Sequence, residues 1–463
     1  MNTPTNKQRI EGLQERVEKL NAVSPTFCLA KWKQSTTTLY NGMTHSCHHP
    51  VQHKITLEDI RNNPRGLHNT PTKIAARADM LKGVQTPECD YCWNIENLGQ
   101  NHISDRHYKS ATENMGIWQS FDEVVASGTG ANIDPAYLEV AFENTCNFKC
   151  SYCSPDVSSR WMEEIQHHGP IKLSDHEHHN LDWLRKTGRF PIHHTQVNPY
   201  IDAFWEWWPE LYQSLHTFRI TGGEPLLSPN TWKVFDYMIE HPRKELSFSV
   251  NTNMGVPPKL VDKLIEKTNQ LNDKIRNITI FTSAESVGPQ AEYSRFGMDW
   301  NAFRSSCEHF LSSTPDNVNF QFMMTLNVFS VSTFDQLLTW ISELRHKFNP
   351  SMARSRIGFN VAYLRWPPFL CLTQLTPELK ASFAASMKNI IDVLQNESST
   401  RSMYLEEVDM INRLVHFASS QEPDPRELLN FRCFVDEYDK RRGTGFLATF
   451  PELKPMHDQG VPK

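Results

Sequence analysis

The 463-residue sequence has no apolar run long enough to cross a bilayer, and residues 1–22 lack the hydrophobic core of a signal peptide. It also lacks an excess of either charge, since 47 lysines and arginines oppose 53 aspartates and glutamates, for a formal charge of −6. A nucleic-acid partner is not expected, because no global basic field is present. Ten cysteines in a chain without a targeting segment favour a reducing compartment, where thiols bind metals rather than pair as disulfides. We expect a cytoplasmic protein without a membrane partner.

Three cysteines lie in one short segment, the three-cysteine loop (residues 144–153), and no other cysteine follows before Cys307. Cys146, Cys150 and Cys153 have the spacing C-x3-C-x2-C. A closed structural zinc site uses four protein ligands, and so does a cluster that only carries electrons. Three thiolates can hold a cubane iron–sulfur cluster and leave one iron open to a small molecule. The loop therefore predicts a catalytic site, with a zinc loop completed by a distant histidine or cysteine as the alternative.

A second motif, residues 219–227, follows a short apolar segment that predicts a buried strand. Gly222 and Gly223 allow close approach of the backbone to a ligand, and Glu224 supplies a carboxylate for a cationic group. Alone, this motif is an ordinary strand-to-helix turn. Together with the three-cysteine loop it resembles the radical S-adenosylmethionine (SAM) superfamily, whose members usually carry an aromatic residue before the third cysteine, as Tyr152 does here.

The resemblance implies a mechanism and a set of binding residues. In that superfamily SAM chelates the open iron, and one electron splits a carbon–sulfur bond to give methionine and a 5′-deoxyadenosyl radical. Gly222, Gly223 and Glu224 would bind the ammonium of SAM. The other cofactor-binding positions that the resemblance suggests, each with an ordinary turn or capping role as the alternative, are Asn251, Ser283, Glu285, Arg295 and Asn327. A reducing partner such as flavodoxin or ferredoxin is also implied.

Strand and helix patterns alternate through the middle of the chain. The expected strands are 137–142, 217–221, 246–250, 278–281, 318–328 and 357–363, and the helices between them are 232–240, 259–267, 300–311 and 334–347. This alternation predicts an α/β protein with a partial (β/α)6, TIM-like barrel, which matches the barrel that the resemblance implies. Both motifs should lie at one rim, because reactive groups sit at the C-terminal ends of parallel strands. After residue 376 we expect helices at 378–394, 405–418 and 425–441, then a loose polar end.

The segment 154–215 between the first two strands is unusually long and holds five tryptophans and seven histidines. The tryptophans are expected to pack in the core rather than form a substrate platform. The cluster His176, His178 and His179 lacks the i, i+4 pairing of a His-Glu-x-x-His site, so a solvated polar segment is expected there.

Four further cysteines precede the barrel: Cys28, Cys47, Cys89 and Cys92. Residues 32–40 followed by Asn41-Gly42 predict a hairpin, with Cys47 on or after its return strand. Thr70-Pro71 and Gly83 bracket a predicted helix, 72–82. These elements allow the four thiols to meet in one closed site.

This arrangement is similar to the twitch module, a shortened relative of the SPASM domain that holds an auxiliary cluster and here lies N-terminal to the barrel. It implies a second 4Fe–4S cluster. The spacing leaves zinc open, held by four cysteines or by three with His45, His48 or His49.

The predicted domains are an N-terminal helix or tail (1–24), the twitch-like module (25–134), the barrel (135–370) and a helical C-terminal region (371–463). The predicted function is a radical SAM enzyme that abstracts hydrogen from a substrate. By analogy with relatives, the first substrate class is a peptide or protein side chain, and the second is a nucleoside or other small metabolite. An iron–sulfur electron carrier or metal-binding scaffold without turnover is a further alternative, although it has no need of the Gly-Gly-Glu motif.

Overall fold

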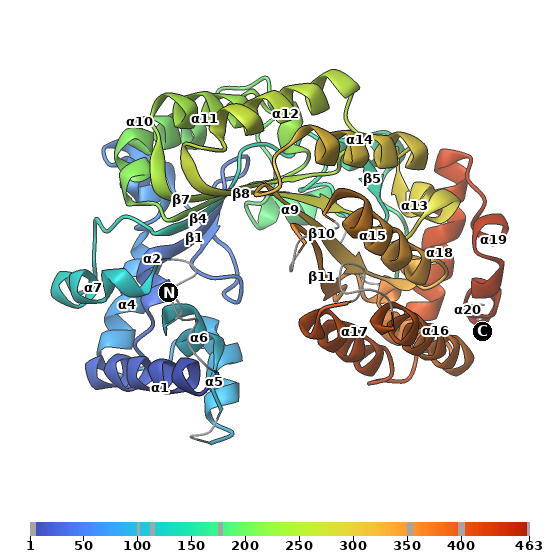
Figure 1. The fold of residues 1–463 in the computed structure, drawn as a ribbon, viewed down its shortest axis with the longest axis horizontal. Helices are drawn as coiled ribbons and strands as arrows, with labels where there is room; N and C mark the ends of the chain where they lie inside the picture. Colours follow the sequence, from blue (N-terminus) through green and yellow to red (C-terminus); the bar gives the residue numbers. More distant parts are fainter. Residues whose placement is uncertain are drawn as a thin grey trace. The chain divides into compact units, whose positions relative to one another are not determined.

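The computed structural model describes residues 6–99, 102–111, 116–174, 179–349, 355–396 and 403–460. The chain divides into two compact units. Unit 1 consists of residues 1–143, 188–222 and 244–248, and unit 2 consists of residues 144–187, 223–243 and 249–463. The predicted α/β class with a largely parallel sheet is confirmed (Figure 1). None of the helices in the described part of the chain combines the length and apolar character of a bilayer span.

The strands of unit 1 are β1 (Gln34–Thr38), β2 (Met43–His45), β3 (His53–Lys54), β4 (Tyr137–Ala141), β6 (Thr217–Thr221) and part of β7 (Arg243–Thr252). Their order is β7-β6-β4-β1-β2-β3. The predicted hairpin is confirmed, because β1 pairs antiparallel with β2 around Gly42, whose φ is +64°. The sequence analysis missed that β1 also pairs in parallel with β4. On its other edge β4 pairs in parallel with β6, with Ala141 opposite Thr221, so the two strands end at the same edge.

The helices of unit 1 are α1 (Asn6–Val23), α2 (Leu29–Lys33), α3 (Leu57–Arg61), α4 (Pro71–Leu81), α5 (Asp90–Glu96), α6 (Asp105–Ala111), α7 (Phe121–Ser127) and α10 (Pro199–Ser214). The predicted helix 72–82 is confirmed as α4, which begins where the Thr70 side chain accepts from the Lys73 N–H at 3.2 Å. A buried cluster that includes Phe27, Trp32 and Trp93 packs around Cys28, Cys89 and Cys92. Three thiols of the N-terminal group therefore lie in the core of unit 1.

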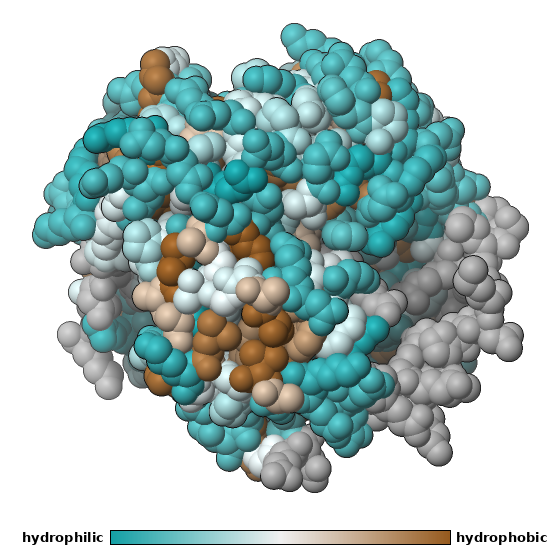
Figure 2. Space-filling model, turned by 90° about the vertical axis from the view of Figure 1, so that its left-hand side faces the viewer, coloured by the Kyte–Doolittle hydropathy of each residue, from teal (hydrophilic) through white to brown (hydrophobic). Residues whose placement is uncertain are grey.

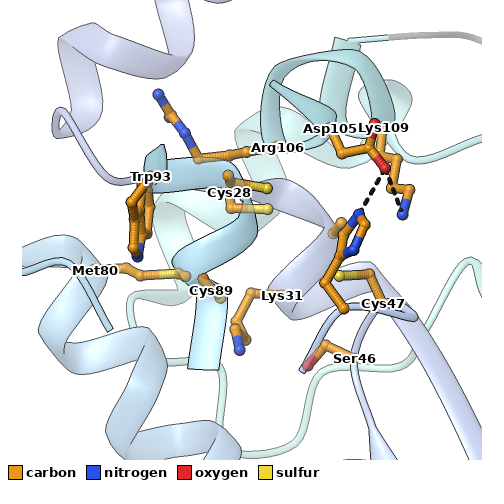
Figure 3. Close-up of a pocket in the computed structure, with 13 residues that line it drawn as sticks. Cys28, Lys31, Ser46, Cys47, Met80, Cys89, Trp93, Asp105, Arg106 and Lys109 are labelled. Atoms are coloured by element: carbon orange, nitrogen blue, oxygen red, sulfur yellow. Dashed lines mark hydrogen bonds and ion pairs between the residues drawn. The ribbon is translucent and has the colours of Figure 1, made fainter. Parts of the chain in front are cut away.

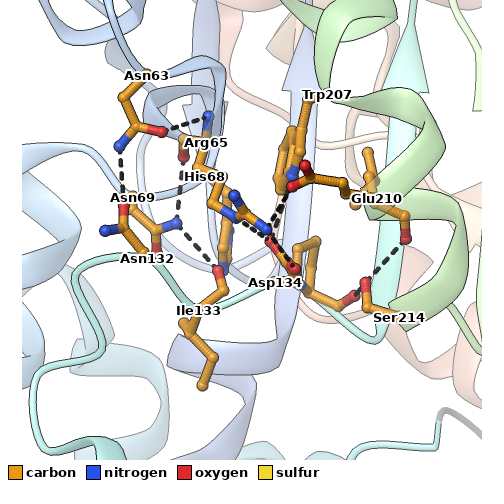
Figure 4. A network of polar contacts seen from close by, with 12 residues as sticks. Asn63, Arg65, His68, Asn69, Asn132, Ile133, Asp134, Trp207, Glu210 and Ser214 are labelled. Atoms are coloured by element: carbon orange, nitrogen blue, oxygen red, sulfur yellow. Dashed lines mark hydrogen bonds and ion pairs between the residues drawn. The ribbon is translucent and has the colours of Figure 1, made fainter.

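A polar network fixes α10 to the N-terminal part of unit 1 (Figure 4). The Arg65 guanidinium donates to both carboxylate oxygens of Asp134, at 2.8 and 3.3 Å, and forms an ion pair with Glu210 at 2.7 Å. The Trp207 indole N–H donates to the same Asp134 at 3.2 Å. Bidentate arginine–carboxylate contacts fix relative orientation as well as distance. Part of the long predicted insertion is thereby built into unit 1.

The face drawn in Figure 2, on the side of α1 and α7, shows hydrophobic residues gathered in one area of a mostly hydrophilic surface. Unit 1 has a surface hollow between α1 and α7, with about 1380 Å³ of empty space that includes open solvent. Its lining residues are Lys19, Ala22, Val23, Trp118, Gln119, Phe121, Asp122 and Val125. None of these is a cysteine, although Val23, Trp118 and Phe121 pack against the buried cluster that contains Cys28, Cys89 and Cys92.

Unit 2 contains the rest of β7 together with β8 (Ile275–Ser283), β10 (Asn319–Leu326) and β11 (Ile357–Tyr363), in the order β7-β8-β10-β11. The helices that alternate with them are α11 (Pro229–Glu240), α12 (Pro258–Leu271), α14 (Trp300–Ser313) and α15 (Phe334–Phe348), as the sequence predicts. From Ile278 onward every second side chain of β8 is buried, as in Ile278 and Ile280, while Phe281 and Ser283 are partly exposed. One face of the sheet therefore packs against helices and the other is free to line a site.

The remaining elements of unit 2 are β5 (Lys149–Cys150), α8 (Ser159–His168), α9 (Leu181–Lys186), α13 (Gly288–Ser294), β9 (Arg295–Phe296), α16 (Pro377–Gln395), α17 (Leu405–Ala418), α18 (Pro425–Arg442), α19 (Phe446–Thr449) and α20 (Lys454–Gln459). The predicted C-terminal helices are confirmed, with α17 packed on β11 and α16 on α15 (Figure 1). The predicted loose polar end is wrong for residues 452–460. Leu453 and Met456 are fully buried there, because α20 packs against α18.

The core role predicted for the tryptophans of segment 154–215 is confirmed for Trp161, Trp207 and Trp208, which are all buried. His179 is also buried, and its ring stacks on Trp161, so the expected solvated segment does not include it. His176 and His178 lie outside the described residues.

Candidate active site

The three-cysteine loop leaves β4 and is held at several backbone positions within unit 2. The Cys146 N–H donates to the Ser159 hydroxyl at 3.1 Å, and the Ser151 N–H donates to the Ser294 carbonyl at 2.7 Å. Cys150 lies in β5, which pairs antiparallel with β9 so that Cys150 is opposite Arg295. Cys150 is buried, whereas Cys146 and Cys153 are partly exposed. The loop therefore presents three thiols from a fixed backbone.

The environment separates the acidities of these thiols. Burial raises the pKa of Cys146 to about 12. A hydrogen bond from Cys153 lowers the pKa of Cys150, and the same bond raises the pKa of Cys153 well above its usual value. The Arg295 guanidinium, with Nη1 3.7 Å from the Cys150 sulfur, also favours the Cys150 thiolate. Cys150 is thus the thiol best prepared to bind a metal.

The spread of the thiols bears on what they can hold. Among the described residues, only His48, His49 and Asp105 form a group of three or more potential ligands whose atoms all lie within 4.8 Å of one another. Tetrahedral zinc, with Zn–S bonds of about 2.3 Å, requires sulfur atoms about 3.8 Å apart. The three loop thiols do not all lie within 4.8 Å of one another, although Cys150 and Cys153 are hydrogen-bonded, so the set is not closed around a single zinc ion.

The Gly-Gly-Glu segment follows β6. A Cβ atom on Gly222 would lie 2.6 Å from the Glu143 carbonyl oxygen, and Gly222 also has a φ of +124°. A Cβ on Gly223 would lie 2.4 Å from the Thr145 carbonyl oxygen. The Glu224 N–H donates to that same oxygen at 2.7 Å. Gly223 and Glu224 therefore pack directly on the backbone beside Cys146. This close packing requires glycine at position 223, because any side chain there would overlap the Thr145 carbonyl.

The Glu224 carboxylate is buried and well supplied with donors. It accepts from the Leu226 N–H at 3.0 Å, the Thr252 hydroxyl at 2.8 Å and the Asn253 N–H at 2.6 Å. Burial raises its pKa to about 7, although these three hydrogen bonds oppose the shift. The carboxylate can therefore gain or lose its charge near neutral pH, and a bound cation would favour the charged form.

Glu285, Arg295 and Tyr152 form one buried network. The Arg295 guanidinium donates to both oxygens of Glu285, at 2.8 and 2.6 Å, and also to the Tyr152 hydroxyl. The Tyr152 hydroxyl and the Thr325 N–H each donate to Glu285 at 3.1 Å. Although burial disfavours the charge of Arg295, Glu285 holds the Arg295 pKa well above its ordinary value. The structure brings these three predicted residues together. The guanidinium of Arg295, however, is already hydrogen-bonded to the carboxylate of Glu285.

The remaining predicted SAM contacts lie at strand ends of unit 2. Ser283 ends β8 and is partly exposed, as is Asn251 in β7. Asn327 is buried, and its side chain accepts from the Phe329 N–H and donates to the Thr325 carbonyl, both at 3.0 Å. Asn327 thus fills the capping role that was its alternative, and its contact with SAM stays a prediction.

Several supporting residues were missed by the sequence analysis. The Asn147 amide donates to the Gly255 carbonyl and accepts from the Asn253 amide, both at 2.8 Å. A Cβ on Gly255 would lie 2.2 Å from the Phe148 ring. The Trp161 indole N–H donates to the Cys150 carbonyl at 2.7 Å. Only the Asn253-Met-Gly255 turn offered a sequence signal, because its glycine marks a close approach.

The four N-terminal thiols line one cavity in unit 1 (Figure 3). Its empty space is about 390 Å³, and its other lining residues include Lys31, Arg106, Lys109 and Asp105. Burial raises the pKa of each thiol, to about 12 for Cys92. Again, no three of these sulfur atoms all lie within 4.8 Å of one another. The donor set fits a four-thiolate group larger than a single ion.

The histidines near this cavity have other partners. A His45 ring nitrogen bonds to the Cys47 carbonyl, and His49 bonds to Asp105 at 2.7 Å. The Lys109 ammonium lies 3.0 Å from the His48 ring nitrogens and 3.2 Å from Asp105. The group His48, His49 and Asp105 thus already has a cation where a divalent metal would bind.

Parts of the chain are similar to known proteins. A segment of 145 residues, 30% of this chain, is 26% identical to GTP 3′,8-cyclase of Aliarcobacter butzleri (strain RM4018) and covers 33% of that enzyme, so the match spans about a third of the curated relative. Among solved structures, SuiB of Streptococcus suis bound to S-adenosylmethionine aligns with 78% of this chain and 68% of its own, with 14% identity and a TM-score of 0.33, too low to carry an argument. No family model matches the chain.

Proposed function

We propose that this protein is a radical SAM enzyme in which Cys146, Cys150 and Cys153 hold a 4Fe–4S cluster with one open iron. The observation that carries the proposal is the contact of the Gly-Gly-Glu segment with the three-cysteine loop, because it holds a buried carboxylate against the backbone of the loop that carries the three thiols. The partial match to GTP 3′,8-cyclase is consistent with this proposal. A cluster held by Cys146, Cys150 and Cys153 would supply the electron for reductive cleavage of SAM, and so the radical chemistry that removes hydrogen from a substrate.

The residues of the chain have distinct tasks in this proposal. Glu224, ionised by the approach of a cation, accepts the SAM ammonium, and Gly223 lets the backbone come close enough for that contact. Arg295 and Glu285 form a nearly neutral buried pair that fixes Tyr152 and keeps a donor on the Cys150 sulfur. We assign contacts with the rest of SAM to Asn251 and Ser283, which are partly exposed near the ends of β7 and β8. The cofactor performs the difficult chemistry, and the protein orients it.

We also propose that the N-terminal thiols hold a second 4Fe–4S cluster rather than zinc. Two observations support this: no three of the four sulfur atoms all lie within 4.8 Å of one another, and all three candidate histidines have other partners. In this proposal residues 25–134 form a twitch-like module and residues 135–370 form a partial (β/α)6 barrel. The N-terminal segment 1–24 and the helical C-terminal region 371–463 flank them.

The proposed substrate is a peptide or protein side chain, and the proposed electron donor is a small redox protein such as flavodoxin or ferredoxin. A nucleoside or other small metabolite is the second substrate class, because the matched cyclase is named for a nucleotide. Neither class needs a basic surface or a membrane.

The test begins with protein purified without oxygen and reduced with dithionite. We expect 5′-deoxyadenosine to form from SAM, and about eight irons per chain for two cubanes. About four irons with one zinc would instead assign a structural metal to the N-terminal site. Iron without SAM cleavage would favour the electron carrier or scaffold.

Cys150→Ala should abolish 5′-deoxyadenosine formation and lower the iron content by about four per chain, because it removes a ligand of one cubane. Cys307→Ala is the matched control, since Cys307 is fully buried in α14 and outside both cysteine groups. If the two variants cleave SAM equally, the assignment of the three-cysteine loop is wrong.

A further inference from the structure

The C-terminal helix α18 contacts the three-cysteine loop through its last residue, Arg442. The Arg442 side chain is fully buried. Its Nη1 donates to the Lys149 carbonyl at 3.2 Å, and its Nε and Nη2 donate to the two oxygens of Glu164 at 3.1 and 3.2 Å. One side chain thus connects α18, α8 and β5.

The neighbouring carbonyl, that of Cys150, is also held by a side chain. The Trp161 indole N–H donates to the Cys150 carbonyl at 2.7 Å, and the Arg442 guanidinium lies over the Trp161 ring at 4.3 Å. The Tyr438 ring lies against that guanidinium at 3.7 Å. A guanidinium stacked on an aromatic ring restricts the orientation of that ring. Arg442 therefore holds the Lys149 carbonyl directly, and it holds the Cys150 carbonyl indirectly, by orienting the Trp161 indole that donates to it.

The charges around Glu164 do not cancel. Lys149 Nζ lies 2.6 Å from Glu164, so this buried carboxylate is shared by Lys149 and Arg442. Arg441 also lies 4.0 Å from Glu164, but Arg441 is paired with Glu437 at 2.8 Å, and Arg295, opposite Cys150 in the β5–β9 pair, is paired with Glu285. The group formed by Lys149, Arg442 and Glu164 therefore leaves one net positive charge near the Cys150 backbone.

We propose that Arg442 is a positioning residue of the three-cysteine loop, through which α18 fixes Cys150 and makes the bound cluster easier to reduce. This rests on the proposed function. Reduction adds one electron, here from dithionite, to an already anionic cluster. A buried positive charge nearby stabilises the reduced state more than the oxidised state, and it therefore raises the reduction potential.

The test compares Arg442→Met, Arg442→Lys and the control Lys440→Met in reduced, anaerobic holoprotein. Lys440 lies on the same helix, but its side chain is 77% exposed, so the control removes a charge without disturbing the buried contacts. The cluster of the three-cysteine loop is identified by the change in its EPR signal when SAM is added. Its midpoint potential and its rate of iron loss to a chelator are then measured.

We expect Arg442→Met to shift the midpoint to a more negative potential and to accelerate iron loss at least threefold, because both the charge and the backbone contact are removed. Arg442→Lys should keep the potential near that of the wild type but still lose iron faster, since it retains the charge without the fork. Lys440→Met should match the wild type. If Arg442→Met does not fold, Arg442→Lys decides the question through its iron loss.

Wild-type potentials and rates in the Arg442 variants would overturn the inference while leaving the proposed function intact. Wild-type protein without a SAM-responsive signal would overturn both. The two failures are thereby distinguished.

Discussion

Replacing Gly223 with alanine separates the binding of SAM from the binding of metal. The new Cβ would lie 2.4 Å from the Thr145 carbonyl oxygen and 2.5 Å from the Asn144 carbonyl oxygen, both of them backbone atoms that cannot rotate away. To reach even 3.0 Å from Thr145, the segment must retreat by about 0.6 Å. That movement lengthens the 2.7 Å hydrogen bond from the Glu224 N–H to the same oxygen.

The cost has two parts. Overpacking of this kind destabilises a fold by about 1–3 kcal/mol. A misplacement approaching 1 Å at a reacting centre costs up to about 100-fold in rate, so we expect SAM cleavage to fall by about 10- to 100-fold. The iron content should not change, because all three thiols remain.

The assay is the rate of 5′-deoxyadenosine formation by anaerobic, reduced protein, with iron counted in the same sample. Gly445→Ala is the matched control, because a Cβ there meets only the Ala448 side chain at 3.5 Å, an ordinary contact. If Gly223→Ala retains iron and cleaves SAM at the wild-type rate, the close contact between the Gly-Gly-Glu segment and the three-cysteine loop is not needed for SAM cleavage, and the reasoning is refuted.

Three further outcomes follow from the described contacts. The affinity for SAM should rise as the pH increases through about 7, because Glu224 then gains the charge that attracts an ammonium, and Glu224→Gln should bind weakly without this dependence in equilibrium dialysis. Arg345→Met should lower the free energy of unfolding by about 3–5 kcal/mol, since it leaves buried Glu407 unpaired, and adding Glu407→Leu should restore most of the loss in chemical denaturation. Burial lowers the pKa of His53 to about 4, so the folded state binds fewer protons than the unfolded state between about pH 4 and 6.5. The contribution of His53 to stability should rise with pH across that window by at most about 3 kcal/mol. His53→Gln should remove that part of the pH dependence, while His45, His48 and His107, whose pKa values burial also lowers to about 4, retain theirs.

The sequence was informative wherever local pattern decides structure. The strand 217–221 and the helix bounded by Thr70-Pro71 and Gly83 appear as predicted, because β-branched runs and caps act over a few residues. The spacing of Cys146, Cys150 and Cys153 likewise identified a candidate site that the fold places on a well-held loop.

Partners distant in sequence could not be predicted. Arg295 was expected to contact SAM, whereas its guanidinium donates to both oxygens of Glu285, a pairing that the sequence analysis did not predict. Arg442 donates to Lys149 across 293 residues, and no periodicity relates them. The helix α20 was missed because its burial depends on the surface that α18 provides. A polar side chain chooses among several possible donors and acceptors only after the chain has folded.

The separation of Lys149 and Arg442 also has a consequence in time. A ribosome that adds about 5–20 residues per second makes Arg442 about 15–60 s after Lys149. For most of that interval the three cysteines of the nascent loop have been made, but the Arg442 guanidinium that will donate to the Lys149 carbonyl has not. Iron delivered during synthesis therefore meets a less restrained loop than iron delivered to the complete, folded chain.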